Sequence, residues 1–257
     1  MANNNSNNPS AALIIIGNEI LSGRTLDKNT QHIAKTLGIL GIDLLEVRVI
    51  PDVEHEIVDT VNALRRKYTY IFTTGGIGPT HDDITPESIA KAFGRKLVLD
   101  KDAHEALIKY YGGEQNLNEG RLKMCYLPEN AGKIFNAVTA APGFYVENVY
   151  VMAGVPKIMQ AMLEAIIPTL ERGVLVQSHT IRALSPESQL AAEMTKAQND
   201  FPDVQIGSYP FLAGDEGYAT AGVNIVFRGK DPARIEASMQ QIEKELNAKS
   251  VSYERIL

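Results

Sequence analysis

From Ala11 onward, short apolar runs alternate with longer amphipathic stretches, and this alternation constrains the fold more than any other feature of the chain. Three runs, Ala11–Ile16, Leu44–Ile50 and Tyr68–Thr74, are rich in β-branched and aromatic residues and are bounded by Gly, Pro or Asp. Between them, apolar side chains recur at helical spacing over 29–40 and 53–67. Because strands joined by crossover helices pair in parallel, the sequence predicts an α/β three-layer sandwich with a mostly parallel sheet.

This first domain is predicted to cover residues 11–172. A helix is expected from Pro86 with Thr85 as its N-cap, because proline favours the first helical turn and threonine accepts amide hydrogen bonds there. The remaining elements are a helix from about Asp102, two short strands near Phe144 and Tyr150, and a final helix over 156–170. The asparagine-rich residues 1–10 are predicted to be disordered.

A different order of elements follows, and it predicts a second, smaller domain over residues 173–257. The expected order is strand, helix, strand, strand and helix, at 174–184, 186–199, 204–210, 221–227 and 232–246. The two adjacent strands are joined by residues whose glycines suit a hairpin loop. The sequence thus predicts a small α+β (βαββα) domain after the first one.

Composition argues against several classes of function. The chain has 25 basic and 31 acidic residues, a formal net charge of -6, and its basic residues do not cluster, so no nucleic-acid partner is expected. The single cysteine, Cys125, cannot form an internal disulfide, and no CxxC, HxxxH or HExxH pattern supports a zinc site. No apolar run is long enough to span a bilayer. We therefore expect a cytoplasmic protein without a membrane partner.

The most informative segment is 73–85, TTGGIGPTHDDIT, which follows a predicted buried strand and opens a helix. Ligands bind at this end of the strands in open α/β sheets. Gly75, Gly76 and Gly78 allow sharp turns that bring backbone N–H groups close to a phosphate. Asp82 and Asp83 could hold Mg²⁺ or position a water. Two alternatives stay open: the glycines form only a tight turn, and an aspartate is an N-cap.

Two other predicted strands end in polar residues. The sequence GNEILSG, residues 17–23, follows the first strand, and Asp52 follows the second. Since parallel strands end at one edge of the sheet, we expect Glu19, Asp52 and Asp83 to converge near a cation. Taken singly, Asp52 also fits an N-cap for a helix at Val53, and Glu19 a surface loop.

Later segments add glycine turns and positive charge. Asn136 precedes the turn Ala141-Pro142-Gly143, and Gly154 precedes the helix expected at Pro156. The cations that could neutralise a ligand phosphate are Arg121, Lys123 and Lys157. In the second domain, Glu187-Ser188 and the run Ile206–Pro210 could line a pocket or an interface, and the alternatives are a helix cap and an edge-strand turn. Its GxxG sequence at 214–217 carries two acids, so it should repel an RNA backbone.

These motifs resemble those of the CinA-like (competence/damage-inducible protein A) family, whose first domain has the molybdopterin-binding MoaB/MogA fold. The resemblance rests on GNEILSG at 17–23, Asn29, Pro51-Asp52, TGGIGPTHDDIT at 74–85, Asn136 with Ala141-Pro142-Gly143, and Gly154-Val155-Pro156. The second domain is similar to the small KH-like domain that follows in CinA proteins. Full-length CinA proteins add an amidohydrolase domain, which we expect this chain to lack.

The resemblance implies two kinds of chemistry. In the MogA branch, the domain adenylylates molybdopterin with ATP and Mg²⁺, using aspartates that match Asp52 and Asp83. In the CinA branch, it is associated with hydrolysis of ADP-ribose at the pyrophosphate. The chain departs from the MogA pattern at Ile77, where that branch has Thr, and at Asp82, where it has Arg. It also has Ala153 where many relatives have Pro. These departures weaken the prediction of molybdopterin adenylylation, whereas the CinA-type pattern is kept better, apart from Ala153.

The sequence therefore predicts a divalent-metal-dependent hydrolase of a nucleotide pyrophosphate such as ADP-ribose, assembled as a homo-oligomer. The alternatives are a non-catalytic molybdopterin or nucleotide binder and a molybdopterin adenylyltransferase of molybdenum cofactor biosynthesis. The predicted catalytic residues are Asp52, Asp82 and Asp83, of which Asp82 and Asp83 are also the predicted metal ligands. The predicted ligand-binding residues are Gly17, Asn18, Glu19, Ser22, Gly23, Gly75, Gly76, Gly78, Thr80, Asn136, Pro142, Gly143, Gly154, Pro156 and Lys157.

Overall fold

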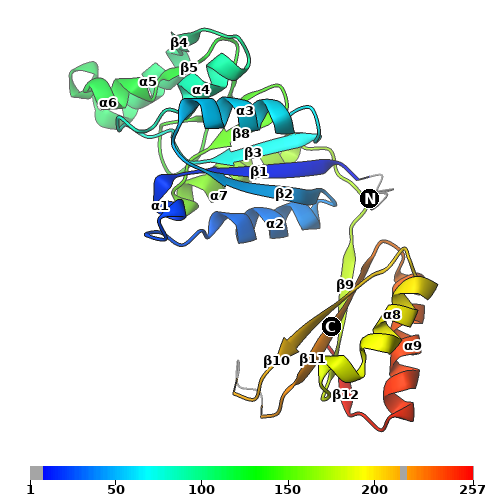
Figure 1. Cartoon of the computed structure of the whole chain (residues 1–257). Helices are drawn as coiled ribbons and strands as arrows, with labels where there is room; N and C mark the ends of the chain where they lie inside the picture. Colours follow the sequence, from blue (N-terminus) through cyan, green and yellow to red (C-terminus); the bar gives the residue numbers. More distant parts are fainter. Residues whose placement is uncertain (1–7, 215–218, 257) are drawn as a thin grey trace. The chain divides into compact units, whose positions relative to one another are not determined.

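The computed structural model describes residues 8–214 and 219–256 (Figure 1). Contacts between residues divide the chain into two units, Met1–Gly173 and Val174–Leu257, which we describe one at a time. Most of the segment 1–10 predicted to be disordered lies outside the described residues, while Ser10 already belongs to the first strand. None of the helices in the described ranges is both long and apolar enough to cross a bilayer.

The first unit is built on a six-stranded sheet with the order β2-β1-β3-β8-β7-β6. Its strands are β1 (Ser10–Ile16), β2 (Asp43–Ile50), β3 (Tyr70–Thr74), β6 (Gly132–Ile134), β7 (Gly143–Val146) and β8 (Val149–Met152). Strands β2, β1, β3 and β8 pair in parallel, whereas β7 runs antiparallel to both of its neighbours. The central strands are buried on both faces, which explains their continuous apolar runs. The predicted mostly parallel sheet is confirmed.

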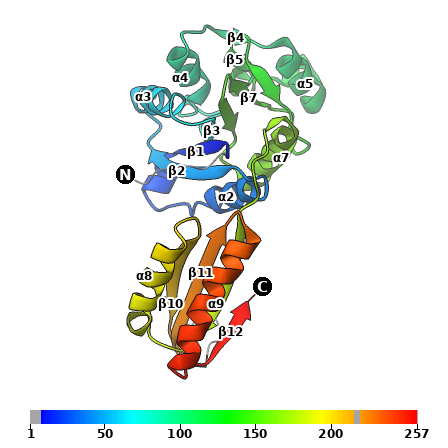
Figure 2. The same ribbon diagram turned by 90° about the vertical axis from the view of Figure 1, so that its right-hand side faces the viewer.

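Helices cover both faces of this sheet (Figure 2). One face packs against α2 (Asn29–Ile39) and α7 (Pro156–Ile166). The other packs against α3 (Glu54–Leu64) and α4 (Thr85–Ala92). Alternate residues of each strand enter opposite cores, as in β3, where Phe72 joins the first core and Ile71 the second. The first unit is therefore the three-layer sandwich that the sequence predicts.

Smaller elements complete the first unit. They are α1 (Asn18–Leu21), β4 (Leu97–Leu99), α5 (Lys101–Tyr111), the 3₁₀ turn η1 (Glu114–Asn116), α6 (Glu119–Lys123), β5 (Tyr126–Pro128) and η2 (Ile167–Thr169). Strands β4 and β5 form a separate two-stranded sheet. The helix expected from about Asp102 begins at Lys101, because the Asp100 carboxylate caps it by accepting from Ala103 N at 2.9 Å.

The second unit is a four-stranded antiparallel sheet with the order β10-β11-β9-β12. Its elements are β9 (Gln177–Ala183), η3 (Glu187–Gln189), α8 (Ala191–Asp200), β10 (Gln205–Phe211), β11 (Gly222–Gly229), α9 (Pro232–Ala248) and β12 (Tyr253–Ile256). Both helices contribute side chains to the core formed with the sheet. The predicted βαββα order is present, followed by β12, a strand that the sequence analysis missed.

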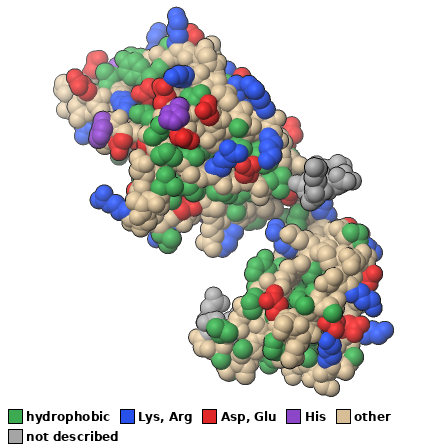
Figure 3. Space-filling model, viewed as in Figure 1, with side chains coloured by type: hydrophobic (Ala, Val, Ile, Leu, Met, Phe, Trp, Pro, Cys, Tyr) green, Lys and Arg blue, Asp and Glu red, His purple; other side chains and the backbone are tan. Residues whose placement is uncertain are grey.

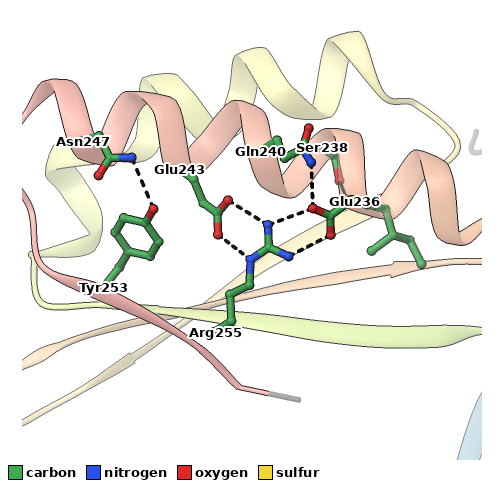
Figure 4. Close-up of polar contacts among 8 residues, drawn as sticks. Glu236, Ser238, Gln240, Glu243, Asn247, Tyr253 and Arg255 are labelled. Carbon is green, nitrogen blue, oxygen red and sulfur yellow. Dashed lines mark hydrogen bonds and ion pairs between the residues drawn. The ribbon is translucent and has the colours of Figure 1, made fainter.

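Strand β12 is fastened to α9 by one arginine (Figure 4). The Arg255 guanidinium donates to Glu243 at 2.6 and 2.8 Å and to Glu236 at 2.8 and 2.9 Å. These two carboxylates raise the pKa of Arg255, and Arg255 in turn lowers the pKa of Glu236. Asn247 adds a hydrogen bond to the Tyr253 hydroxyl at 3.3 Å. Side chains of the preceding helix thus hold the last strand.

Two predicted helix ends differ from those observed. Thr85 is the first residue of α4, and Ile84 is its N-cap, because the Thr85 hydroxyl donates to Gly75 O at 3.0 Å instead of accepting from the helix. The final helix of the first unit ends at Ile166 rather than at residue 170, since Pro168 interrupts the α-helical bonding and a 3₁₀ turn follows. Neither difference changes the order of elements.

Candidate functional site

Four parallel strands of the first unit end at one edge of the sheet, and their loops contact one another there. Gly17 N, after β1, donates to Ile50 O at the end of β2 at 3.1 Å. Gly75 N, after β3, donates to Met152 O at the end of β8 at 3.1 Å. The predicted site segments that follow these four strands therefore lie side by side, as expected for the carboxyl edge of a parallel sheet.

The glycine loop after β3 leaves three backbone donors unused. Gly75 and Gly76 have φ of 106° and 67°, a conformation that favours glycine, and a Cβ at either one would collide with Ile16 O or Thr85 Oγ1. The N–H groups of Gly76, Ile77 and Gly78 donate no hydrogen bond to any described residue. Consecutive free N–H groups at a loop that opens a helix form a cradle for an anion.

The Asp83 carboxylate forms hydrogen bonds within the glycine loop. Its Oδ2 accepts from Thr80 N at 2.8 Å and also from the Thr80 hydroxyl. The carboxylate lies over Gly78, 2.7 Å from where a Cβ of that residue would stand. No side chain caps α4, so Asp83 is not its N-cap, and this alternative is excluded. A larger residue at 78 would therefore have to displace the Asp83 carboxylate.

A small cavity beside this loop brings two carboxylates and an ammonium group together. Asp83, Glu87 and Lys123 line it, together with Ile77, Gly78, Pro86, Met124, Leu127, Pro142 and Phe144. Glu87 Oε2 is buried and has no hydrogen-bond partner among the described residues. A desolvated carboxylate oxygen is costly unless a water, an ion or a ligand completes its hydrogen bonds.

Glu87 is a site residue that the sequence analysis missed. It stands in the first turn of α4, where an acidic residue is favoured by the helix dipole alone. Asp83 precedes the first residue of α4, so helical spacing could not have paired the two carboxylates, and only the packing of the loop against α4 brings Glu87 to the cavity.

Lys123 supplies the positive charge of the cavity. Its ammonium donates to Thr80 O at 2.9 Å, which holds it beside the loop. Arg121, by contrast, is used elsewhere: it donates to Asn116 O at 2.6 Å and lies 3.9 Å above the Tyr111 ring centre. Lys157 is exposed in the first turn of α7. Of the three predicted cations, only Lys123 lines the cavity.

Asp82 differs from Asp83 in its surroundings. It is exposed, and polar interactions, first with Thr80 and then with its own backbone amide, hold the pKa of Asp82 below its ordinary value. The described residues contain no group of three or more His, Cys, Asp or Glu side chains placed to hold a metal ion. Mg²⁺ commonly binds through one or two carboxylates plus substrate phosphates, so Asp82 and Asp83 fit an ion that arrives with a phosphorylated ligand.

Asp52 is not the N-cap of the helix that follows it, which was one of its two predicted roles. Helix α3 begins at Glu54 with Val53 as its N-cap, and the Asp52 carboxylate instead accepts from Asn18 N at 2.8 Å. It thus ties the end of β2 to the first residue of α1. Strand β1 lies between β2 and β3, and Asp52 does not line the cavity that holds Asp83.

The remaining residues after β1 form the short helix α1 and its end. The Glu19 carboxylate folds over Gly17, 2.6 Å from where a Cβ would stand, and is exposed. The Ser22 hydroxyl donates to Glu19 O at 3.3 Å, and Gly23 has a positive φ of 70°. These residues shape the edge of the sheet next to Gly17.

Of the residues predicted from the later turns, Pro142 lines the cavity, whereas Asn136, Gly143 and Pro156 do not. The Asn136 side-chain amide forms hydrogen bonds within its own loop: it accepts from Val138 N and Thr139 N and donates to Ala141 O. That loop leads to Pro142, which lines the cavity, and Gly143 is buried as the first residue of β7. Pro156 is the first residue of α7.

Gly154 joins the glycine loop to α2. Asn29 Nδ2 donates to Gly154 O at 2.8 Å, and a Cβ at Gly154 would stand 3.3 Å from the Gly75 Cα. Asn29 therefore positions the loop after β8 against the loop after β3.

Charged side chains on the first unit are mixed rather than sorted. Figure 3 shows acidic, basic and histidine side chains interspersed over the visible face. The arrangement at the sheet edge combines a backbone cradle for an anion with two carboxylates and one ammonium in an adjoining cavity. The fold and the site thus define an α/β domain suited to small phosphorylated ligands.

Comparison with known proteins assigns the family. Residues 12–172 match the family described as "Probable molybdopterin binding domain". A protein of Archaeoglobus fulgidus is 36% identical over 237 residues, covering 92% of this chain and 98% of that one. A CinA-like protein of Kosmotoga olearia is 33% identical over 254 residues, which are 95% of this chain and 60% of that protein.

A solved structure agrees. The crystal structure of the protein CinA with unknown function from Thermoplasma acidophilum is 36% identical, with a TM-score of 0.60 over 64% of this chain and 99% of that one. The chain belongs to the family of the probable molybdopterin binding domain, with CinA-like proteins among its relatives.

The second unit gives a different result from the one expected. Residues 175–255 match the family described as "FAD synthase, middle domain". The predicted likeness to a KH domain is not confirmed, and most of its GxxG sequence, residues 215–217, lies outside the described residues.

Proposed function

We propose that the first unit hydrolyses a nucleotide pyrophosphate such as ADP-ribose with the help of a divalent cation. The observation that carries the proposal is the pairing of three free loop amides, at Gly76, Ile77 and Gly78, with a cavity that contains Asp83 and Glu87. An anion cradle next to carboxylates fits a phosphorylated substrate that is to be attacked by water.

The residues of the site divide the work as follows. The loop amides bind the non-bridging oxygens of one phosphate. The Lys123 ammonium offsets the negative charge of the second phosphate, which is the leaving group. Glu87, whose Oε2 lacks a partner, takes a proton from water as the water oxygen bonds to phosphorus. The bond from phosphorus to the bridging oxygen breaks, and that oxygen leaves on the second phosphate. A divalent cation bound by the substrate phosphates and Asp83 or Asp82 would withdraw negative charge from the phosphoryl group.

The second unit supports an adenine dinucleotide as the substrate class. Its match to the middle domain of FAD synthase associates it with an enzyme whose product, FAD, contains a pyrophosphate joined to adenosine. ADP-ribose has the same adenosine pyrophosphate. Hydrolysis of ADP-ribose would release AMP and ribose 5-phosphate, and hydrolysis of FAD would release AMP and FMN.

A second function has its own support. The family description, probable molybdopterin binding domain, favours a protein that holds a pterin phosphate in the same cradle without hydrolysing it. Such a binder would use the three amides and Lys123 but would not require Glu87.

The test is AMP release by the purified full-length chain from ADP-ribose and FAD with Mg²⁺, Mn²⁺ or Co²⁺. We expect Asp83→Asn and Glu87→Gln to lower turnover by about a hundredfold or more, because they remove a charged ligand and a general base. Asp59→Asn and Glu105→Gln, exposed carboxylates on α3 and α5, are the matched controls and should retain full rates. No turnover with any cation, together with tight binding of a molybdopterin-like ligand, would favour the binder instead.

A further inference from the structure

A groove in the second unit joins two motifs that the proposed chemistry of the first unit leaves unused. Glu187 and Ser188 stand in η3, and Ile206 and Ser208 stand in β10, about twenty residues later. All four line one open groove with a volume of about 520 Å³, and the Ser208 hydroxyl donates to Glu187 Oε1. The structure therefore unites both motifs in a single site.

The wall of the groove is held by an internal side chain. Gln198, on α8, donates to Val204 O at 2.9 Å and to Phe201 O at 3.3 Å, and accepts from Ile206 N at 2.9 Å. These bonds fix the start of β10 against the helix. The groove is thus a feature of the folded unit rather than a gap between loosely packed elements.

The lining has two chemical parts. Ala191, Met194 and Ile206 form an apolar part, and Met194 and Ile206 are also packed against the core. Glu187, Ser188 and Thr195 are among the polar residues that line the groove. A flat ring fits the apolar part, where a methionine adapts to its outline.

Charge determines the class of ligand. Of the described residues that line the groove, Glu187 alone carries a charge. Its Oε2 accepts no hydrogen bond from the described residues. A phosphate would meet a carboxylate and no cation, so phosphorylated groups are disfavoured. A ribose diol, in contrast, donates well to a carboxylate, the contact by which dinucleotide-binding folds hold ribose.

We propose that this groove binds the nucleoside part of a ligand, with the ribose hydroxyls on Glu187 and the base over Met194 and Ile206. The volume lies within the range of small-molecule sites. The proposal does not depend on hydrolysis by the first unit, because it concerns a site built from other residues.

The test measures binding of adenosine to the full-length chain by calorimetry. We expect Glu187→Gln to weaken binding about tenfold, since hydrogen bonds to a charged acceptor are lost. Ala191→Phe, which fills the groove, should abolish it. Two control variants should bind adenosine like the unchanged protein. One is Lys196→Ala, which changes an exposed residue of the same helix outside the groove, and the other is Asp83→Asn in the first unit.

Comparison of nucleosides tests the assigned contacts. Binding of 2′,3′-dideoxyadenosine should be about tenfold weaker than that of adenosine, and Glu187→Gln should remove that difference. The proposal fails if adenosine does not bind at millimolar concentration, if Ala191→Phe binds it normally, or if Asp83→Asn abolishes binding. Thermal unfolding of each variant confirms that the second unit is still folded. Loss of AMP release in the first unit would leave this outcome unchanged, so the two proposals can fail separately.

Discussion

The candidate sites of the two units differ in the groups that form them, which are backbone amides in the first unit and side chains in the second. In the first, backbone N–H groups of a glycine loop face outward at the edge of a parallel sheet, and side chains complete the cavity beside it. In the second, side chains from η3, α8 and β10 line a groove with one carboxylate. Backbone N–H groups attract anions through their own dipoles, whereas a side-chain groove takes its preference from the residues present. We accordingly propose a phosphate as the ligand of the first unit and an uncharged ring with a diol as the ligand of the second.

The largest expected effect comes from removing the backbone cradle. Gly76→Ala places a Cβ at φ 67° against the Thr85 hydroxyl, so the loop must move. We expect AMP release to fall about a hundredfold or more and the free energy of unfolding to fall by about 1–3 kcal/mol. Gly38→Ala in α2, where a Cβ meets open space, is the matched control and should keep its activity. Equal losses in both variants would show that the conformation at Gly76 is unimportant.

The edge strands of the two units allow a second comparison, through their ion pairs. Arg255→Gln should destabilise the second unit by about 1–2 kcal/mol, because Glu236 and Glu243 are left facing each other without a cation. Hydrogen exchange of the β12 amides measures the loss. Arg228→Gln, an exposed residue of β11, is the control. If β12 kept its protection without Arg255, its pairing with β9, the Arg182–Glu254 ion pair and the Asn247–Tyr253 hydrogen bond would suffice to hold it.

In the first unit, the corresponding cluster lies on the edge strand β2. Hydrogen bonds from Tyr68, and then from Lys67 and Arg48, lower the pKa of Glu46 from 4.5 to about 2. A lowered carboxyl pKa stabilises the folded state above pH 4.5, and this contribution is lost as the pH falls towards 2. Glu46→Gln should therefore lower the free energy of unfolding by about 1–2 kcal/mol at pH 7, allowing for partial exposure.

Urea unfolding at several pH values checks that expectation. The difference between Glu46→Gln and the unchanged protein should shrink between pH 4.5 and 2, while Glu105→Gln should show no such difference. A deficit that stayed constant with pH would point to lost packing rather than to lost charge.

The smallest expected effect separates the two aspartates that the sequence placed in one site. Asp52→Asn keeps an oxygen that can accept from Asn18 N, so AMP release should change by about threefold or less. The comparison is with Asp83→Asn under the same conditions. If both variants lost activity to the same extent, Asp52 would act together with Asp83, as the sequence analysis predicts.

The sequence by itself determined the main strands and helices of both units and the position of the glycine loop, but not β12 or the short elements α1, β4, β5, β6 and α6. These features depend on neighbours along the chain: alternating apolar runs form strands and helices, and Gly75 and Gly76 adopt backbone angles that disfavour other residues. For the same reason, the carboxyl edge of the sheet could be predicted as the place where the loops meet.

Only the tertiary structure decided which side chains share a site. It brought Glu87 and Lys123 to the cavity of Asp83, turned Asp52 towards Asn18, and joined Glu187 to Ser208. It also added β12, whose Arg255 donates to Glu236 and Glu243 of α9. Such contacts depend on how helices dock and how strands align over long separations. Because many residues of suitable chemistry could occupy those positions, local patterns do not specify which ones meet.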